Sequence, residues 1–167
     1  MNESIFIKKT HSPVGPLTLA CTDDSVCGLW FEDARFYLYG LPQNVIEADH
    51  PMQRILENWL EEYFAGNKPT IDFPIRTFGS AFQRSVWEQL RKIPYGQTVS
   101  YGQIAKVLLD QTGKNVSARA VGGAVGRNPL SIAIPCHRVI GADGSLTGYG
   151  GGLDRKRFLL QLEGMML

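Results

Sequence analysis

A proline-punctuated stretch, "PTIDFPIRTFG" at residues 69–79, separates two hydrophobic patterns and restricts the fold more than any other feature of the chain. Before it, short apolar segments that alternate with polar residues and are joined by turn residues predict β-strands. After it, apolar residues recur at helical spacing. Because strands come first and helices second, the pattern predicts an α+β fold. We place the domain boundary inside the stretch, which gives domains 1–76 and 77–167.

The first half predicts an antiparallel meander followed by one helix. The expected strands are residues 4–10, 17–22 and 26–31. Residues 32–48 show no clear pattern. The helix begins near Pro51 and ends before Gly66, because proline is favoured in a first turn and glycine after a last one. Its expected buried face consists of Met52, Ile55, Leu56, Trp59, Leu60 and Tyr63.

The second half predicts three helices. Ser80 is the expected N-cap of the first, whose apolar face carries Phe82, Val86, Leu90 and Ile93. Two shorter helices follow Ser100 and Ser117, with Gly113 between them. This arrangement is typical of a helix-turn-helix, in which residues 118–126 would be the recognition helix. Helix pairs joined by glycine also occur in proteins that bind no nucleic acid.

The overall net charge of +1 hides an asymmetry. Residues 1–79 hold six Lys or Arg against eleven Asp or Glu, whereas residues 80–167 hold eleven against five. A basic half in a nearly neutral chain is typical of a surface that meets a polyanion such as nucleic acid. Chance partition over a solvated surface is the alternative. At 167 residues with 44% hydrophobic content, the chain can bury a core, so disorder is not expected.

Three cysteines, an odd and sparse set, do not suggest a disulfide framework and indicate a reducing, cytoplasmic compartment. No run has the length of a membrane span, and the N-terminus lacks the pattern of a secretion signal. Cys21, Cys27, His11 and His50 lack metal-ligand spacing, so we expect no structural zinc and no cofactor. Cys21 and Cys27 more simply fill the core.

The adjacent pair Cys136–His137, in "SIAIPCHRVIGADG", is the main candidate for chemistry. A thiolate is the nucleophilic form of cysteine, and histidine is the usual base near neutral pH. Neighbours in an extended strand point to opposite faces, so His137 would need a bend or a bridging water to reach the thiol. Pro135 and the turn that follows make a bend possible. The alternative is a buried, inert thiol beside an unrelated histidine.

Two further segments can be read in two ways. The helix 118–126 is built mainly of small residues, with Arg119 as its lone charge, which suits either close helix packing or contact with something narrow. Adjacent glycines weaken such a helix by about 1 kcal/mol each. The glycine-rich stretch 141–156 is either a plain surface loop or the wall of a pocket. Its spacing matches neither a phosphate-binding loop nor a dinucleotide fingerprint.

Residues 80–164 resemble the O6-alkylguanine-DNA alkyltransferases. The resemblance rests on "IPCHRVIG", on "RAVGGAVGRNP" before it and "GYGGGLDRK" after it, and on "FQRSVWEQLRKIPYGQTVSYGQIA". Agreement in the first half is looser, through "SPVGPLTLA". The resemblance implies a small ribonuclease-H-like N-terminal domain with antiparallel strands and a C-terminal winged helix-turn-helix domain that holds the active site.

The resemblance also implies an activity. Such proteins repair duplex DNA by moving an alkyl group, typically methyl, from O6 of guanine to their own cysteine, here Cys136. The thioether is stable, so each molecule acts once. The family pairs the cysteine through a water with histidine, here His137, and the histidine with a glutamate, here Glu163. Asn128 matches the asparagine that tethers the helix-turn-helix to the active-site segment.

For DNA, the resemblance implies minor-groove binding and extrusion of the damaged base into the protein. Arg119 matches the arginine that replaces the extruded guanine, and Tyr101 the tyrosine that meets the flanking phosphate and the base. The guanine pocket is implied at Val139, Tyr149 and Gly150. The DNA-binding set is Ser100, Tyr101, Ala118, Arg119, Gly122 and Gly123. We expect a monomer that binds double-stranded DNA carrying O6-alkylguanine and meets no membrane.

Three other functions remain open at this point. A lesion sensor would bind alkylated DNA without transfer, although the retained "PCHR" argues against it. A helix-turn-helix regulator would use the same DNA contacts, but we expect no additional domain and the first half is acidic. A cysteine hydrolase would require turnover. Alkyl size, action on O4-alkylthymine and the role of the first half are left undecided by the sequence.

Overall fold

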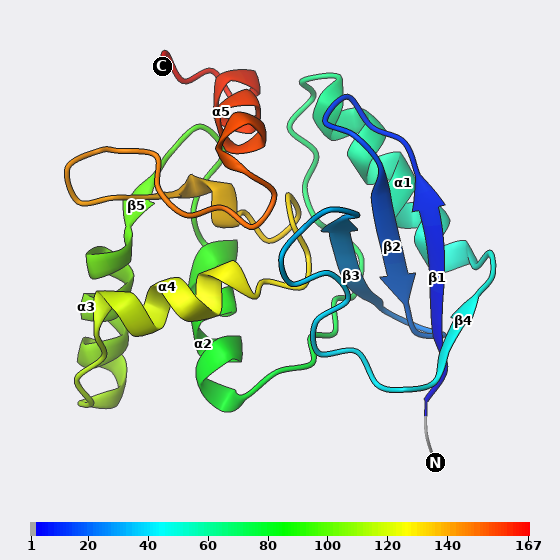
Figure 1. Cartoon of the computed structure of the whole chain (residues 1–167), viewed down its shortest axis with the longest axis horizontal. Helices are drawn as coiled ribbons and strands as arrows, with labels where there is room; N and C mark the ends of the chain where they lie inside the picture. The colour runs from blue at the N-terminus through cyan, green and yellow to red at the C-terminus, as the bar shows by residue number, and fades with distance from the viewer. Residues whose placement is uncertain (1–2) are drawn as a thin grey trace.

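The structure, a computed structural model, describes residues 3–167 and places a β-sheet with one covering helix beside a helical part (Figure 1). The first part contains β1 (Ile5–Thr10), β2 (Leu17–Cys21), β3 (Val26–Phe31), β4 (Val45–Glu47) and α1 (Pro51–Phe64). The second contains α2 (Ala81–Arg91), β5 (Val99–Ser100), α3 (Tyr101–Thr112), α4 (Ala118–Gly126), the 3₁₀ turn η1 (Cys136–Arg138), β6 (Val139–Ile140) and α5 (Leu153–Leu162). The predicted α+β class is confirmed.

The sheet has the strand order β3-β2-β1-β4. The predicted antiparallel meander is present, with Ile7 opposite Ala20 and Leu19 opposite Leu29. A fourth strand, β4, was not predicted and pairs with β1 in parallel. This strand lies in the stretch 32–48, which had no pattern, and it is only half-buried or exposed, so its sequence carries little hydrophobic signal.

Helix α1 packs on the sheet through residues of the predicted face, of which Leu56, Trp59, Leu60 and Tyr63 are buried. Ile55 was expected in that face but is 41% exposed. Gln53 is buried instead, and its amide donates a hydrogen bond to Ala48 O at 3.0 Å. A buried amide that finds such a partner can replace an apolar residue at little cost, which periodicity alone does not reveal.

The outer edge of β3 is covered by two segments from elsewhere in the chain, residues 74–76 and 129–131. Leu29 N–H donates to Pro129 O at 2.8 Å, and Ser131 N–H donates back to Leu29 O at 2.9 Å. β3 is buried along its whole length. The chain that leads to Cys136 is therefore joined to the sheet by backbone hydrogen bonds.

Three helices of the second part, α2, α3 and α4, begin at a serine as expected, whereas α5 was not predicted and follows Gly152. Ser80, Ser100 and Ser117 accept a hydrogen bond from the backbone N–H three residues on, which satisfies a group the helix leaves unpaired. α3 ends at Gly113, whose φ of +71° is unfavourable for other residues. α3 and α4 pack together as a helix-turn-helix, and α2 supports α4 by a bond from Trp87 Nε1 to Ala124 O at 2.8 Å. Phe82, expected in the core of this part, is 37% exposed.

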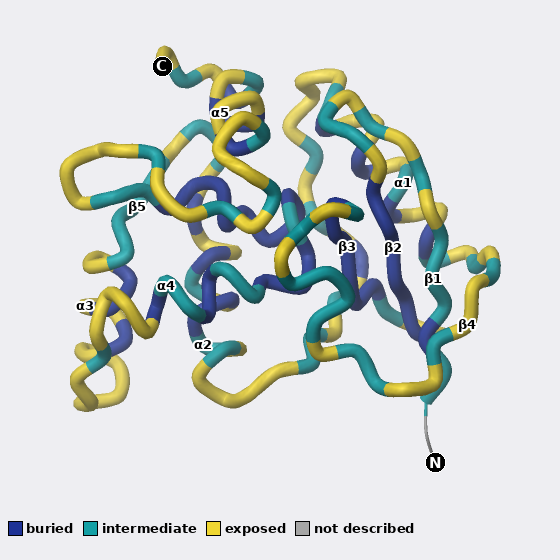
Figure 2. Tube along the Cα trace, in the orientation of Figure 1, coloured by how far each residue is buried: buried dark blue, intermediate teal, exposed yellow. Residues whose placement is uncertain are grey.

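The expected glycine-rich loop 141–156 is shorter than predicted, because α5 begins at Leu153. The side chain of Lys156 on this helix is completely buried. Its ammonium group donates to Val139 O and to Thr147 O, so it fixes the loop against η1 and β6. Figure 2 shows the resulting contrast between exposed loop backbone and the buried segment beneath it.

Replacement of Gly28 by Ala tests how tightly β3 is packed. A Cβ at this position would lie 2.1 Å from the ring of Trp30, which is itself buried, so the ring must move. We expect a loss of about 1–3 kcal/mol in the free energy of unfolding, measured by urea denaturation. Gly102→Ala in helix α3 is the control: the nearest atom to its Cβ, Ser100 Oγ, lies 3.9 Å away, so stability should be unchanged or slightly increased. An unaltered urea midpoint for Gly28→Ala would contradict the packing.

Candidate functional site

Cys136 lies at the start of η1, not in an extended strand. Its N–H donates to Ile134 O at 2.8 Å, and the residue is only 5% exposed. In a 3₁₀ turn, successive side chains are about one third of a turn apart, so the objection that Cys136 and His137 must face opposite ways does not apply. The bend that Pro135 made possible is present.

Asn128 fastens the segment before Cys136 to the end of α4. Its amide donates to Ile134 O at 2.7 Å and to Leu130 O at 3.3 Å, and its carbonyl accepts from Leu130 N–H at 3.0 Å. Within this clasp Ile132 has a φ of +71°, a conformation that β-branched residues rarely adopt. The clasp therefore holds a strained backbone that directs the chain into η1.

His137 is completely buried, and its Nε2 lies 2.6 Å from Glu163 Oε2. An ionised carboxylate can only accept, so a neutral imidazole must donate from Nε2. Nδ1 is then an acceptor, and it has no hydrogen-bond partner within residues 3–167. An unpaired buried acceptor next to a cysteine is what a proton relay requires.

Glu163, at the end of α5, is the centre of a buried hydrogen-bond network. Besides His137, it accepts from Tyr63 OH at 2.6 Å, from Arg138 at 2.7 and 3.0 Å, and from Gly96 N–H at 3.1 Å. Burial alone would raise the pKa of Glu163, but the hydrogen bonds from His137 and Arg138 outweigh it and lower the pKa. Tyr63 and Arg138 were not predicted as site residues; only the position of Arg138, next to His137, could have suggested it.

Burial shifts the pKa of both reacting groups, Cys136 and His137, toward their uncharged forms. Burial raises the pKa of Cys136, against the opposing effects of Asn128 and of the Lys156 charge. Burial also lowers the pKa of His137, which outweighs the nearby Glu163 carboxylate. Glu163 therefore orients a ring whose neutral form is favoured by burial.

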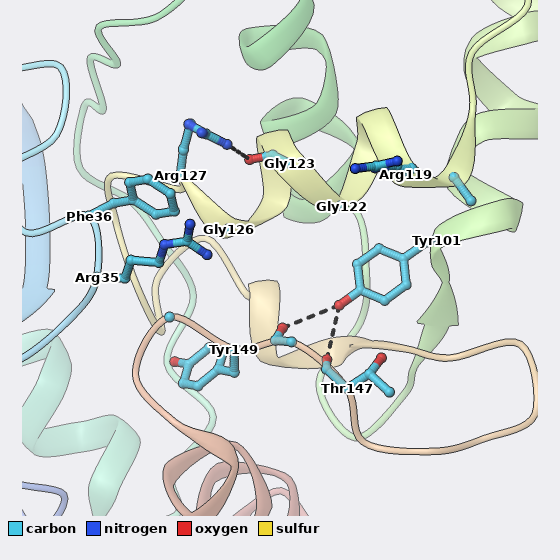
Figure 3. A pocket seen from close by; sticks show the side chains of 13 residues that line it. Arg35, Phe36, Tyr101, Arg119, Gly122, Gly123, Gly126, Arg127, Thr147 and Tyr149 are labelled. Atoms are coloured by element: carbon cyan, nitrogen blue, oxygen red, sulfur yellow. Dashed lines mark hydrogen bonds between the residues drawn. The ribbon is translucent and has the colours of Figure 1, made fainter.

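An open cavity of about 640 Å³ lies over the site, between α4 and the loop that carries Tyr149 (Figure 3). Tyr101 closes one side, where its hydroxyl donates to Thr147 O at 3.1 Å. Three arginines line the cavity, Arg35, Arg119 and Arg127, and no acidic residue of the described chain does so. The cavity is suited to a polyanion.

A second, much smaller space of about 20 Å³ lies beside Cys136 and is called here the inner compartment. It is lined by Trp30, Ala34, Phe36, Val125, Gly126, Asn128, Ser131, Cys136 and Gly148–Gly151. Five of these residues, Phe36, Gly126, Gly148, Tyr149 and Gly150, also line the open cavity. The open cavity and the inner compartment are therefore adjacent, and Cys136 belongs to the inner one.

The structure gathers most of the predicted residues. Those that line the open cavity are Tyr101, Ala118, Arg119, Gly122, Gly123, Tyr149 and Gly150. Ser100 and Val139 line neither space: Ser100 caps α3, and Val139 is completely buried, with its carbonyl accepting from Lys156. Arg35 and Phe36 were not predicted, because they lie in the stretch 32–48 that carried no pattern. Within residues 3–167, no group of His, Cys, Asp and Glu could hold a metal ion.

Comparison with known proteins agrees over nearly the whole chain. Residues 5–77 match the 6-O-methylguanine DNA methyltransferase ribonuclease-like domain, and residues 81–165 match the DNA binding domain of the same name. A methylated-DNA–protein-cysteine methyltransferase of Shigella flexneri is 54% identical, covering 96% of both chains. One from Mycolicibacterium paratuberculosis is 47% identical, covering 95% of this chain and 92% of the relative.

A solved structure gives the same result. The crystal structure of Mycobacterium tuberculosis OGT in complex with DNA superposes with a TM-score of 0.82 at 42% identity, covering 95% of this chain and 92% of the other. Relatives above 40% identity, each covered over at least 92% of its length, share the fold and the family. The chain belongs to the 6-O-methylguanine DNA methyltransferase family.

Proposed function

We propose that this protein repairs duplex DNA by a single transfer of an alkyl group, methyl first, from O6 of guanine to Cys136. The observation that carries the proposal is the buried series Cys136, His137 and Glu163 beneath an arginine-lined cavity at a helix-turn-helix. The names of the relatives, methylated-DNA–protein-cysteine methyltransferases, support the reaction type.

The chemistry starts from a neutral thiol and a neutral imidazole. The thiol proton passes through one water to His137 Nδ1, the acceptor left open when Nε2 bonds to Glu163. The sulfur forms a bond to the alkyl carbon as the carbon–O6 bond breaks, and its electron pair moves to O6. The guanine anion takes a proton from solvent at N1 while His137 releases the thiol proton to solvent, so atoms and charge balance and the imidazole is neutral again. A thioether does not hydrolyse under these conditions, so the protein is spent after one turnover.

DNA binds to the second half of the chain. The small residues of α4, Ala118, Gly122 and Gly123, line the open cavity and suit a groove only about 6 Å wide. We propose that Arg119 takes the place of the extruded base and that Tyr101 contacts the backbone beside it. Ser100 would contribute only through the capped start of α3, and Val139 through its backbone from beneath the site.

We further propose the domain boundary between residues 76 and 77, a monomer, and a cytoplasmic location. The extended segment between α1 and α2 supports the boundary, and the two family matches meet close to it, the first ending at residue 77 and the second beginning at residue 81. The three cysteines are unpaired, which suits a reducing compartment. Among residues 3–167, no helix is both long and apolar enough to cross a bilayer.

A lesion-binding protein without transfer is the competing function. It would need the cavity and the helix-turn-helix but not a buried base held next to a thiol. The orientation of His137 by Glu163 at 2.6 Å therefore favours transfer.

Mass spectrometry after mixing with excess duplex DNA that contains O6-methylguanine tests the reaction. We expect a gain of one methyl group on the peptide that holds Cys136 and an equal loss of methyl from the DNA. Cys136→Ser should abolish both changes. Cys27, buried in the sheet, is an internal control and should stay unmodified. Binding without any transfer would overturn the proposal in favour of a lesion sensor.

The pH dependence of transfer tests the neutral starting state. Burial lowers the pKa of His137 from its ordinary value and raises that of Cys136. His137 can accept a proton only when it is neutral, so the single-turnover rate with free O6-methylguanine nucleoside should be flat across neutral pH. The rate should fall only at pH values below the ordinary pKa of histidine, about 6.5. A fall in rate whose midpoint lies above pH 7 would instead show that the resting imidazole is charged, because the ordinary pKa of histidine is about 6.5.

Arg119→Ala tests base extrusion. Its rate on O6-methylguanine in duplex DNA should fall about tenfold or more, since nothing then fills the vacated stack. Its rate on the free nucleoside should change little. Arg91→Ala, a charge-matched control on α2 that lines neither space, should leave both rates unaltered. Equal losses on both substrates would assign Arg119 to a different task.

A further inference from the structure

The inner compartment takes one of its walls from the first half of the chain. Trp30, Ala34 and Phe36 face it, whereas Gly148–Gly151 and Asn128 belong to the second half. The second half supplies mostly backbone and small side chains there. Tyr149 is the aromatic side chain that the second half adds, and the other two, Trp30 and Phe36, come from the sheet and from the segment that follows it.

The segment of residues 33–39, called here the wall segment, is fastened at its start. Arg155 on α5 bonds to Asp33 Oδ1 at 2.5 Å and to Val14 O at 2.7 Å. The same guanidinium stacks over Phe31 at 4.6 Å. The start of the wall segment is thus tied to the helix that also carries the buried Lys156.

The wall segment is also fastened at its far end. Arg127, which follows α4, lies over the ring of Phe36 at 4.4 Å and over that of Tyr39 at 5.8 Å. Arg127 itself donates to Gly123 O at 2.9 Å, so its position on the helix is fixed. Tyr37 adds a hydroxyl contact of 2.8 Å to Thr18 in β2. These contacts hold the wall segment in place, unlike an unsupported surface loop.

Phe36 lies where the open cavity meets the inner compartment, since it lines both. Its ring reaches the C-terminal end of α4, where a Cβ on Gly126 would stand 3.9 Å from it. Figure 3 shows Phe36 and Arg35 on the side of the cavity opposite Tyr101. A group carried on O6 toward Cys136 crosses this junction, and the Phe36 ring forms one of its walls.

We propose that Phe36 sets the upper size of the alkyl group that Cys136 accepts. The inner compartment, at about 20 Å³, has room for a group the size of a water molecule, close to that of a methyl group. A benzyl group exceeds the volume of the inner compartment several-fold. To enter, it requires the Phe36 ring to move against Arg127, which lies over the rings of Phe36 and Tyr39 and is called here the Arg127 clamp. This inference rests on the proposed role of Cys136 as alkyl acceptor.

The test compares two duplexes of one sequence that differ only in carrying O6-methylguanine or O6-benzylguanine. The measured quantity is the ratio of the benzyl to the methyl single-turnover rate, in which DNA binding cancels. Phe36→Ala should raise this ratio on the order of tenfold or more, and Phe36→Leu should give an intermediate value. An unchanged ratio in a folded Phe36→Ala protein overturns the inference.

Two further variants test whether Phe36 acts through the volume of its ring or by holding the wall segment in place. Tyr39→Leu removes one ring from the Arg127 clamp but leaves the Phe36 ring in place. Its ratio of benzyl to methyl rate should stay within about twofold of that of the unaltered protein, well below the change in Phe36→Ala. An increase as large as that of Phe36→Ala would overturn the inference, because the size limit would then come from a mobile loop. Ala34→Val narrows the compartment and should lower the ratio, which keeps the idea testable if Phe36→Ala fails to fold.

The same experiment distinguishes failure of the inference from failure of the proposed function. If the unaltered protein transfers methyl to Cys136 and the ratio of benzyl to methyl rate is the same in the Phe36 variants, only the inference fails. If the unaltered protein transfers neither group, the role of Cys136 itself is wrong.

Discussion

The buried carboxylate of Glu163 is the constraint on which the rest of the site depends. A charge in a protein interior is tolerated only when hydrogen bonds and an opposite charge surround it. Here these come from distant segments: Tyr63 on α1, Gly96 after α2, and His137 and Arg138 in η1. Each partner must be in place for the others to be stable. The sheet, the helical part and α5 are thereby held in one arrangement.

The same burial sets the chemistry. It keeps Cys136 as a thiol and His137 as a neutral base, so the resting protein presents no charged nucleophile to solvent. Reactive thiolates are exposed to oxidation and to unintended alkylation, and a protein that acts once loses its function by either. A site that generates its nucleophile only when a base and its alkyl group are present avoids this loss.

Local features of the sequence predicted most of the architecture. Alternation identified β2, and short apolar segments next to turn residues identified β1 and β3. Pro51 and Gly66 bounded α1, and serine caps identified the starts of α2 to α4. The Cys136–His137 pair was visible in the sequence, but its partner Glu163 came from a family resemblance. What could not be predicted depends on contacts between distant segments: the edge strand β4, the bonds of Tyr63 to Glu163, and the place of Phe36 beside Cys136. No local pattern encodes these contacts.

The covered edge of β3 has a consequence for how the protein is made. Synthesis produces this apolar strand well before residues 129–131, which pair with it through Leu29. Until then the strand presents unpaired backbone groups on a hydrophobic edge, the type of surface that pairs with other chains. The nascent first half is therefore vulnerable to aggregation, and the segment that delivers the reactive cysteine is also the one that ends this exposure.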